Sequence, residues 1–100
     1  MDGLRIVSEP RRREILRLVW GRELAAGEIA ERFDLTFGAV SQHLGILRDA
    51  GYVRVRREGN RRLYLADRDG LGALAPVLEA MWASTLDRLA DAVESDSDAR

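Results

Sequence analysis

The repeat of apolar residues changes at Gly51, and this change constrains the fold more than any other feature of the sequence. Before Gly51 the apolar residues recur at helical intervals, whereas two valines that follow it alternate with arginines. In a second alternating run Leu63 and Leu65 are the apolar residues, and they alternate with Arg62 and Tyr64. A Gly-Asn pair, typical of a tight hairpin turn, separates the two runs. A β-hairpin is therefore predicted after a set of helices.

The helical patterns before Gly51 predict a helix-turn-helix unit. Ser8 is expected to cap a first main helix that runs to about residue 20, with a helical turn or two preceding it. Residues 25–33 and 36–50 are expected to form two short amphipathic helices joined by a tight break, with Thr36 capping the second. The hairpin that follows is then in the position of a wing.

The part of the chain after the hairpin predicts a terminal helix capped by Asp67 or Asp69, and Pro76 should kink or restart this helix. A chain of 100 residues with 46% apolar residues supports one modest core. The expected organisation is one mainly helical domain over residues 1–94 and a disordered polar tail over residues 95–100.

Several classes of function are disfavoured by what the sequence lacks. It has no cysteine, which removes disulfides, thiolate metal sites and cysteine catalysis. It has no glycine-rich phosphate loop and no base with an orienting partner, so an enzyme is not expected. It has neither an N-terminal apolar run typical of a signal peptide nor an apolar stretch long enough to span a membrane, and a cytoplasmic protein is expected.

The distribution of charge points to a polyanionic partner, although the net charge is only −1. Six arginines stand against two acidic residues from Ser41 to Arg62, whereas six acidic residues stand against two arginines from Glu79 to Arg100. Such a split favours one face that binds nucleic acid and another that stays away from it.

The predicted helix over residues 36–50 supplies a face suited to reading DNA. On a helical wheel Val40, Leu44 and Leu47 share one side, and Gln42 lies opposite with small residues around it. Gln pairs bidentately with adenine, and arginines of the hairpin can reach phosphates or the minor groove. The predicted DNA-binding residues are Thr36, Phe37, Gly38, Ser41, Gln42, His43, Arg48, Arg54, Arg56, Arg57, Asn60, Arg61 and Arg62.

Three blocks of the sequence, in order, resemble the ArsR/SmtB winged-helix repressors, and the resemblance covers about residues 4–94. The blocks are residues 9–16 (EPRRREIL), 39–53 (AVSQHLGILRDAGYV) and 56–64 (RREGNRRLY). The resemblance implies a homodimer that places two recognition helices in successive major grooves and represses a promoter until a signal relieves it. It also implies pairing of the terminal helices, for which the predicted residues are Leu4, Ile6, Val7, Leu78, Met81, Trp82, Leu86, Leu89 and Val93.

The ligands that metal-sensing members of this family use do not occur in the matching positions. The last helix offers Asp87, Asp91 and Glu94 but no histidine, and Zn-type sites need imidazole or thiolate. No metal or cofactor is therefore predicted, and the chain resembles a metal-independent branch of the family. A pocket for an apolar inducer near Met81 and Trp82 stays open beside plain dimer packing.

One alternative function is retained, a winged-helix module that binds protein without reading DNA. An exposed apolar face on the helix over residues 36–50 would favour it. The small and polar residues on that face and the arginines of the hairpin argue for DNA instead.

Overall fold

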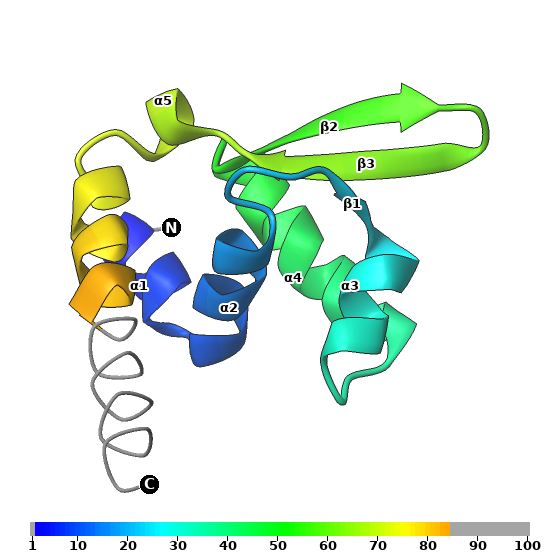
Figure 1. Ribbon diagram of the computed structural model, residues 1–100, viewed down its shortest axis with the longest axis horizontal. Helices are drawn as coiled ribbons and strands as arrows, with labels where there is room; N and C mark the ends of the chain where they lie inside the picture. The colour runs from blue at the N-terminus through cyan, green and yellow to red at the C-terminus, as the bar shows by residue number, and fades with distance from the viewer. Residues whose placement is uncertain (1, 85–100) are drawn as a thin grey trace, which may run out of the picture.

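The computed structural model describes residues 2–84, which form a helical body with a hairpin projecting from it (Figure 1). The predicted fold class, mainly helical with one projecting hairpin, is confirmed. In chain order the elements are α1 (Gly3–Ser8), α2 (Pro10–Leu18), β1 (Leu24–Ala25), α3 (Ala26–Arg32), α4 (Phe37–Asp49), β2 (Val53–Glu58), β3 (Arg61–Ala66), α5 (Arg68–Leu71) and a helical segment over residues 74–84. The predicted tail over 95–100, and with it Leu86, Leu89 and Val93, lies outside the described residues. None of the helices within residues 2–84 is long and apolar enough to cross a membrane.

The first main helix begins one residue later than predicted, because its cap is Glu9. The Glu9 carboxylate accepts a hydrogen bond from the backbone N–H of Arg12 at 3.1 Å, and Pro10 fills the first helical turn. The prediction that Ser8 caps this helix is wrong. Its hydroxyl donates to the carbonyl of Arg5 at 2.8 Å and so closes the end of α1 instead.

The two helices of the predicted helix-turn-helix unit start in different ways. Ala25 precedes α3, and its methyl side chain cannot accept a hydrogen bond from the first helical turn. At this helix start the Ala25 N–H donates to the Glu28 carboxylate, at 2.9 Å. Thr36 caps α4 as predicted, with its hydroxyl accepting the N–H of Ala39 at 3.1 Å. At the other end of α4, Gly51 adopts a φ of 81°, which lets the chain turn away from the helix.

The hairpin belongs to a three-stranded antiparallel sheet of order β1-β3-β2, and β1 was not predicted. β1 has two residues, too few to show an alternating pattern, and pairs Leu24 with Tyr64. Tyr64 stands at a predicted polar position, yet it is only 9% exposed because this part of β3 lies against the body. Val55, paired with Tyr64 across the hairpin, is in contrast 37% exposed.

The core lies where α2, α3 and α4 meet, and it fixes the orientation of α4. Val40, Leu44 and Leu47 are almost completely buried, as the helical wheel predicts. They pack in one cluster with Ile15 of α2 and Ile29 of α3. Burying several large aliphatic side chains contributes about 1.5–3 kcal/mol each, so α4 cannot rotate about its axis without a large loss. The opposite face of α4 must therefore point outward.

The region after the hairpin packs closely against the body beside Gly51. Asp67 caps α5 by accepting the N–H of Gly70 at 3.1 Å, and an added Cβ at Gly70 would lie 1.8 Å from the carbonyl oxygen of Gly51. Gly72, with a φ of 57°, ends α5, and Pro76 lies in the first turn of the next helical segment. The predicted restart of the helix is therefore confirmed, with the break just before Pro76.

Candidate nucleic-acid interface

The outward face of α4 is small and polar near its start. Gly38, Ser41 and Gln42 are exposed, and Phe37 at the first position is 61% exposed. The hydroxyl of Thr36 accepts the N–H of Ala39 and so caps α4, and this hydrogen bond defines where α4 begins. A surface this flat allows close approach of another molecule, and the first turn presents backbone N–H groups suited to an anion.

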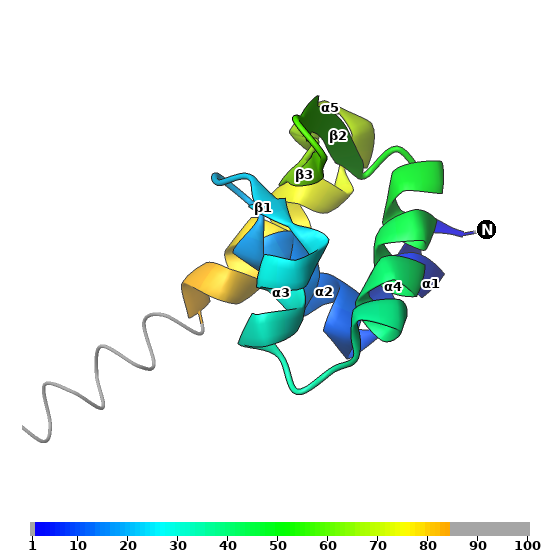
Figure 2. The same cartoon turned by 90° about the vertical axis from the view of Figure 1, so that its right-hand side faces the viewer.

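The start of α4 and the hairpin border one hollow of about 360 Å³. Phe37 and Ser41 line it from α4, and Asn60, Arg62 and Tyr64 line it from the hairpin. These positions are separated by about twenty residues in the sequence, and the packing of β3 against the body brings them together. In Figure 2, the hairpin is seen nearly end-on above α3 and α4.

One face of the hairpin carries arginines without an ion-pair partner. The register places Arg57 directly opposite Arg62, on the same face as Val55 and Tyr64. Two like charges opposite each other destabilise a strand pair. Neither guanidinium forms an ion pair within residues 2–84. This face therefore holds two positive charges without an ion-pair partner in the described part of the chain, and one of them, Arg62, borders the hollow beside α4.

The other face of the hairpin is neutralised by carboxylates from elsewhere in the chain. Arg56 donates two hydrogen bonds of 2.9 Å to Glu23, one to each carboxylate oxygen. Arg61 pairs with Glu28 at the start of α3. Because both acids lie 33 residues before their partners, the sequence pattern did not indicate these pairs.

At the base of the hairpin Arg54 pairs with Asp67 at 3.1 Å. The hydrogen bond from Arg54 and the N–H of Gly70 hold the pKa of Asp67 below its ordinary value. The hydrogen bond from Arg56 likewise lowers the pKa of Glu23, and that pair in turn raises the pKa of Arg56. These three arginines are held by carboxylates of the same chain while their side chains stay more than half exposed, so their contact with DNA remains a prediction.

His43 and Arg48 occupy the flanks of α4 and not its outward face. The His43 side chain is 21% exposed, and its Nδ1 lies 3.7 Å from a carboxylate oxygen of Glu9, the cap of α2. That nitrogen is buried and has no hydrogen-bond partner within residues 2–84. Arg48 is exposed and pairs with the neighbouring Asp49 at 3.4 Å. His43 therefore faces the body, in disagreement with its predicted contact with DNA.

Comparison with known proteins agrees with this geometry. A model of the family described as "Bacterial regulatory protein, arsR family" matches residues 9–55. The HTH-type transcriptional regulator Rv2034 of Mycobacterium tuberculosis is 40% identical over 88% of this chain and 81% of its own length. The chain belongs to the arsR family.

Solved structures extend the match to the whole fold. The crystal structure of a possible transcriptional regulator for arsenical resistance is 35% identical, with a TM-score of 0.70, over 91% of this chain and 95% of its own. The homodimeric winged helix-turn-helix DNA-binding domain of Mb0332 from Mycobacterium bovis is 28% identical, with a TM-score of 0.65, over 85% and 75%. This arsR-family chain is a DNA-binding transcriptional regulator with a winged helix-turn-helix fold, in which α3 and α4 form the helix-turn-helix and the hairpin is the wing.

The residues predicted to pair two copies of this arsR-family protein divide into two groups. Leu4 and Met81 are exposed, at 66% and 45%. Ile6, Val7 and Leu78 are buried within the chain at 7% exposure or less, so they do not fit the predicted contact with a second copy. Each of them was assigned from a helical apolar pattern, and such a pattern does not distinguish a core from an interface.

Trp82 was predicted to lie in the dimer interface and beside an inducer pocket. In the structure it packs against Trp20 of the same chain. Its ring meets that of Trp20 edge to face, with centroids 4.7 Å apart. The indole N–H of Trp20 donates to Glu79 at 3.1 Å, and Arg68 pairs with the same carboxylate. The aromatic pair therefore fastens the segment over 74–84 to the end of α2.

No group of three His, Asp or Glu residues within residues 2–84 is arranged to hold a metal ion. The carboxylates Asp87, Asp91 and Glu94 lie outside this part of the chain.

Proposed function

We propose that this regulator reads a specific duplex sequence with the first half of α4 and holds the DNA backbone with one face of its wing. The observation that carries the proposal is the facing pair Arg57 and Arg62, which has no ion-pair partner within residues 2–84, together with the hollow that Arg62 and the exposed Ser41 share. Like charges left facing each other on a folded surface are unfavourable without an anionic partner, and duplex DNA supplies one.

The exposed side chains of α4 contact the edges of the bases. Gln42 can pair bidentately with an adenine edge in the major groove, and Ser41 can contact a base or a phosphate. Gly38 adds no bulk, so the helix can lie deep in the groove. Phe37, exposed at the first position, suits apolar contact with a thymine methyl group.

The wing has two roles on its two faces. Arg57 and Arg62 contact phosphates, and Asn60 at the turn reaches the edge of the minor groove. Arg54, Arg56 and Arg61 brace the wing through their carboxylate partners, and this division replaces the prediction that all five arginines contact DNA.

The regulator acts as a homodimer built on its terminal segments. Exposed Leu4, Val77 and Met81 leave apolar area on α1 and on the segment over 74–84 for a second copy. Leu86, Leu89 and Val93 continue this pattern in a domain over residues 1–94, before a polar tail. Two α4 helices then enter successive major grooves, about 34 Å apart.

The regulator represses a promoter in the cytoplasm by occupying this site, and a signal such as a small-molecule inducer relieves the repression. The resemblance to the ArsR/SmtB repressors supports repression that a signal relieves.

Fluorescence anisotropy with the duplex upstream of the protein's own coding sequence tests the proposal. A random duplex of the same length serves as the control, and both are titrated at several salt concentrations. We expect saturable preference for the upstream duplex at two protomers per site. Equal affinity for both duplexes would reject sequence reading at this site, and no binding at any salt concentration would favour the protein-interaction module.

A further inference from the structure

A cleft of about 550 Å³ lies between α2 and α3, apart from the DNA-facing surface. Its lining includes Arg17, Arg22, Arg32 and Glu14. The volume falls in the range of pockets that hold small organic molecules, about 300–1,000 Å³.

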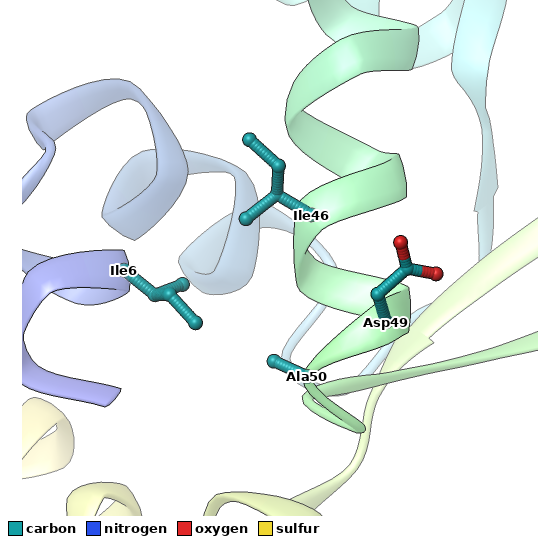
Figure 3. A pocket seen from close by; sticks show the side chains of 4 residues that line it. All are labelled: Ile6, Ile46, Asp49 and Ala50. Atoms are coloured by element: carbon teal, nitrogen blue, oxygen red, sulfur yellow. The ribbon is translucent and has the colours of Figure 1, made fainter. Parts of the chain in front are cut away.

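A smaller hollow between α1 and the end of α4 differs from this cleft in charge. Ile6, Ile46 and Ala50 give it an apolar lining, and Asp49 supplies its one charged side chain (Figure 3). It holds about 210 Å³, below the usual range for a small-molecule site. The α2–α3 cleft is larger and cationic, so it is the better candidate for a ligand.

The arginines of the α2–α3 cleft differ from Arg54, Arg56 and Arg61 of the wing in making no ion pair. Arg17, Arg22 and Arg32 form neither an ion pair nor a guanidinium hydrogen bond within residues 2–84. Arg22 does lie near Glu28, whose pKa is lowered by the N–H of Ala25 and also by the charges of Arg61 and Arg22. Glu14 supplies one negative charge to the lining against three positive ones. The same chain neutralises three arginines of its wing with well-placed carboxylates, so the excess of positive charge in this cleft is a local feature.

Two apolar side chains line the cleft beside the arginines. Leu18 and Phe33 are both partly buried and pack against the core. A lining that combines apolar and cationic side chains is complementary to a molecule with an apolar body and an anionic end. Guanidinium groups bind carboxylates through two parallel hydrogen bonds, which makes arginine well suited to such an anion.

We propose that the α2–α3 cleft binds a small aromatic or aliphatic carboxylate. The carboxylate lies among the guanidinium groups of Arg17, Arg22 and Arg32, and the apolar body packs on Leu18 and Phe33. The site uses none of the residues assigned to DNA or to the second copy.

Because the cleft lies between two helices that support α4, a ligand bound there changes the affinity for DNA. This role rests on the proposed function. Both α2 and α3 pack on α4. A ligand that spans Arg17 on α2 and Arg32 on α3 fixes the spacing of the two helices that support the recognition helix. Any change that it causes in DNA affinity must be matched by an equal effect of DNA on ligand affinity.

Binding is tested on the full chain without DNA, by titration of backbone amide NMR signals with sodium benzoate. Benzamide has nearly the same shape without charge, and acetate has the charge without the ring. We expect saturable shifts at Leu18, Phe33 and the neighbouring amides with benzoate, and binding at least about tenfold weaker for both controls.

The triple variant R17Q/R22Q/R32Q should weaken benzoate binding at least about tenfold. Arg11→Gln, an exposed arginine on the same helix as Arg17 but outside the cleft, is the matched control and should leave it unchanged. Equal binding of benzoate and benzamide, or full affinity in a folded triple variant, would overturn the site.

Anisotropy with and without benzoate then tests the role of the site. A change in DNA affinity supports the coupling, whereas an unchanged DNA affinity with benzoate bound rejects the effect of the site on DNA. Absence of DNA binding without benzoate would instead count against the proposed function.

Discussion

The two faces of the wing carry similar residues but have opposite electrostatic environments. Arg56 and Arg57 are neighbours on β2, and alternation places their side chains on opposite faces of the hairpin. Arg56 is held by Glu23, whereas Arg57 faces Arg62. The difference shows that the number of arginines in a wing does not give the number of DNA contacts. The carboxylates that reach one face decide which arginines are left for DNA.

The largest effect is expected from reversing the charge of the Arg57–Arg62 face. R57E/R62E replaces two positive charges by two negative ones beside the DNA backbone in each protomer. We expect the affinity for the upstream duplex to fall more than about a hundredfold at moderate salt, because attractions to phosphate become repulsions. Anisotropy measures the affinity, and circular dichroism checks that the variant is folded. A folded variant with near-normal affinity would place the DNA elsewhere.

A smaller effect is expected at α4, and it differs in kind. Gln42→Ala should weaken the specific duplex by about 1–3 kcal/mol, because alanine cannot form the bidentate hydrogen bonds to a base. The affinity for random duplex should stay the same, since Gln42 does not hold phosphates. Competition between the two duplexes measures the ratio. Equal weakening for both duplexes would contradict base reading.

The neighbouring pair Arg57 and Arg56 gives the sharpest test of the two faces. Arg57→Ala should weaken specific and random duplexes alike and reduce the slope of log affinity against log salt by about one unit for each phosphate that the variant no longer neutralises. Arg56→Ala is the matched control and should leave the slope unchanged, because its guanidinium is engaged by Glu23. If both variants lowered the slope equally, the distinction between the faces would be wrong.

The smallest effect concerns the stability that the braced face adds. The pKa of Glu23 is lowered in the folded chain, so its pair with Arg56 contributes stability above the ordinary carboxyl pKa and loses it as the pH falls through the folded value. Arg56→Ala should therefore lower Tm slightly at pH 7, and the difference from the parent should shrink as the pH falls below the ordinary carboxyl pKa and vanish below the lowered pKa of Glu23 in the folded chain. Thermal unfolding at several pH values measures this, and a difference that persists in acid would point to an effect on packing instead.

The sequence predicted the helix-turn-helix unit, the wing and the face of α4 because each has a local signal. Thr36, Gly51 and the Gly59–Asn60 turn act within a few residues of themselves, and the apolar period of α4 is set by Val40, Leu44 and Leu47. Ser8 was assigned wrongly because two polar residues precede Pro10 and either can serve as a cap. The strand β1 was missed because two residues show no period.

The sequence by itself determined the order and type of the main elements, since hydrophobic period, caps and turn residues are local properties. Only the tertiary structure decided which residues of those elements remain available for partners. Glu23 and Glu28 reach the wing from positions far away in the chain, and the burial of Ile6, Val7 and Leu78 follows from packing between separate segments. Charge pairing and burial depend on distances in space, and residue spacing along the chain does not encode them directly.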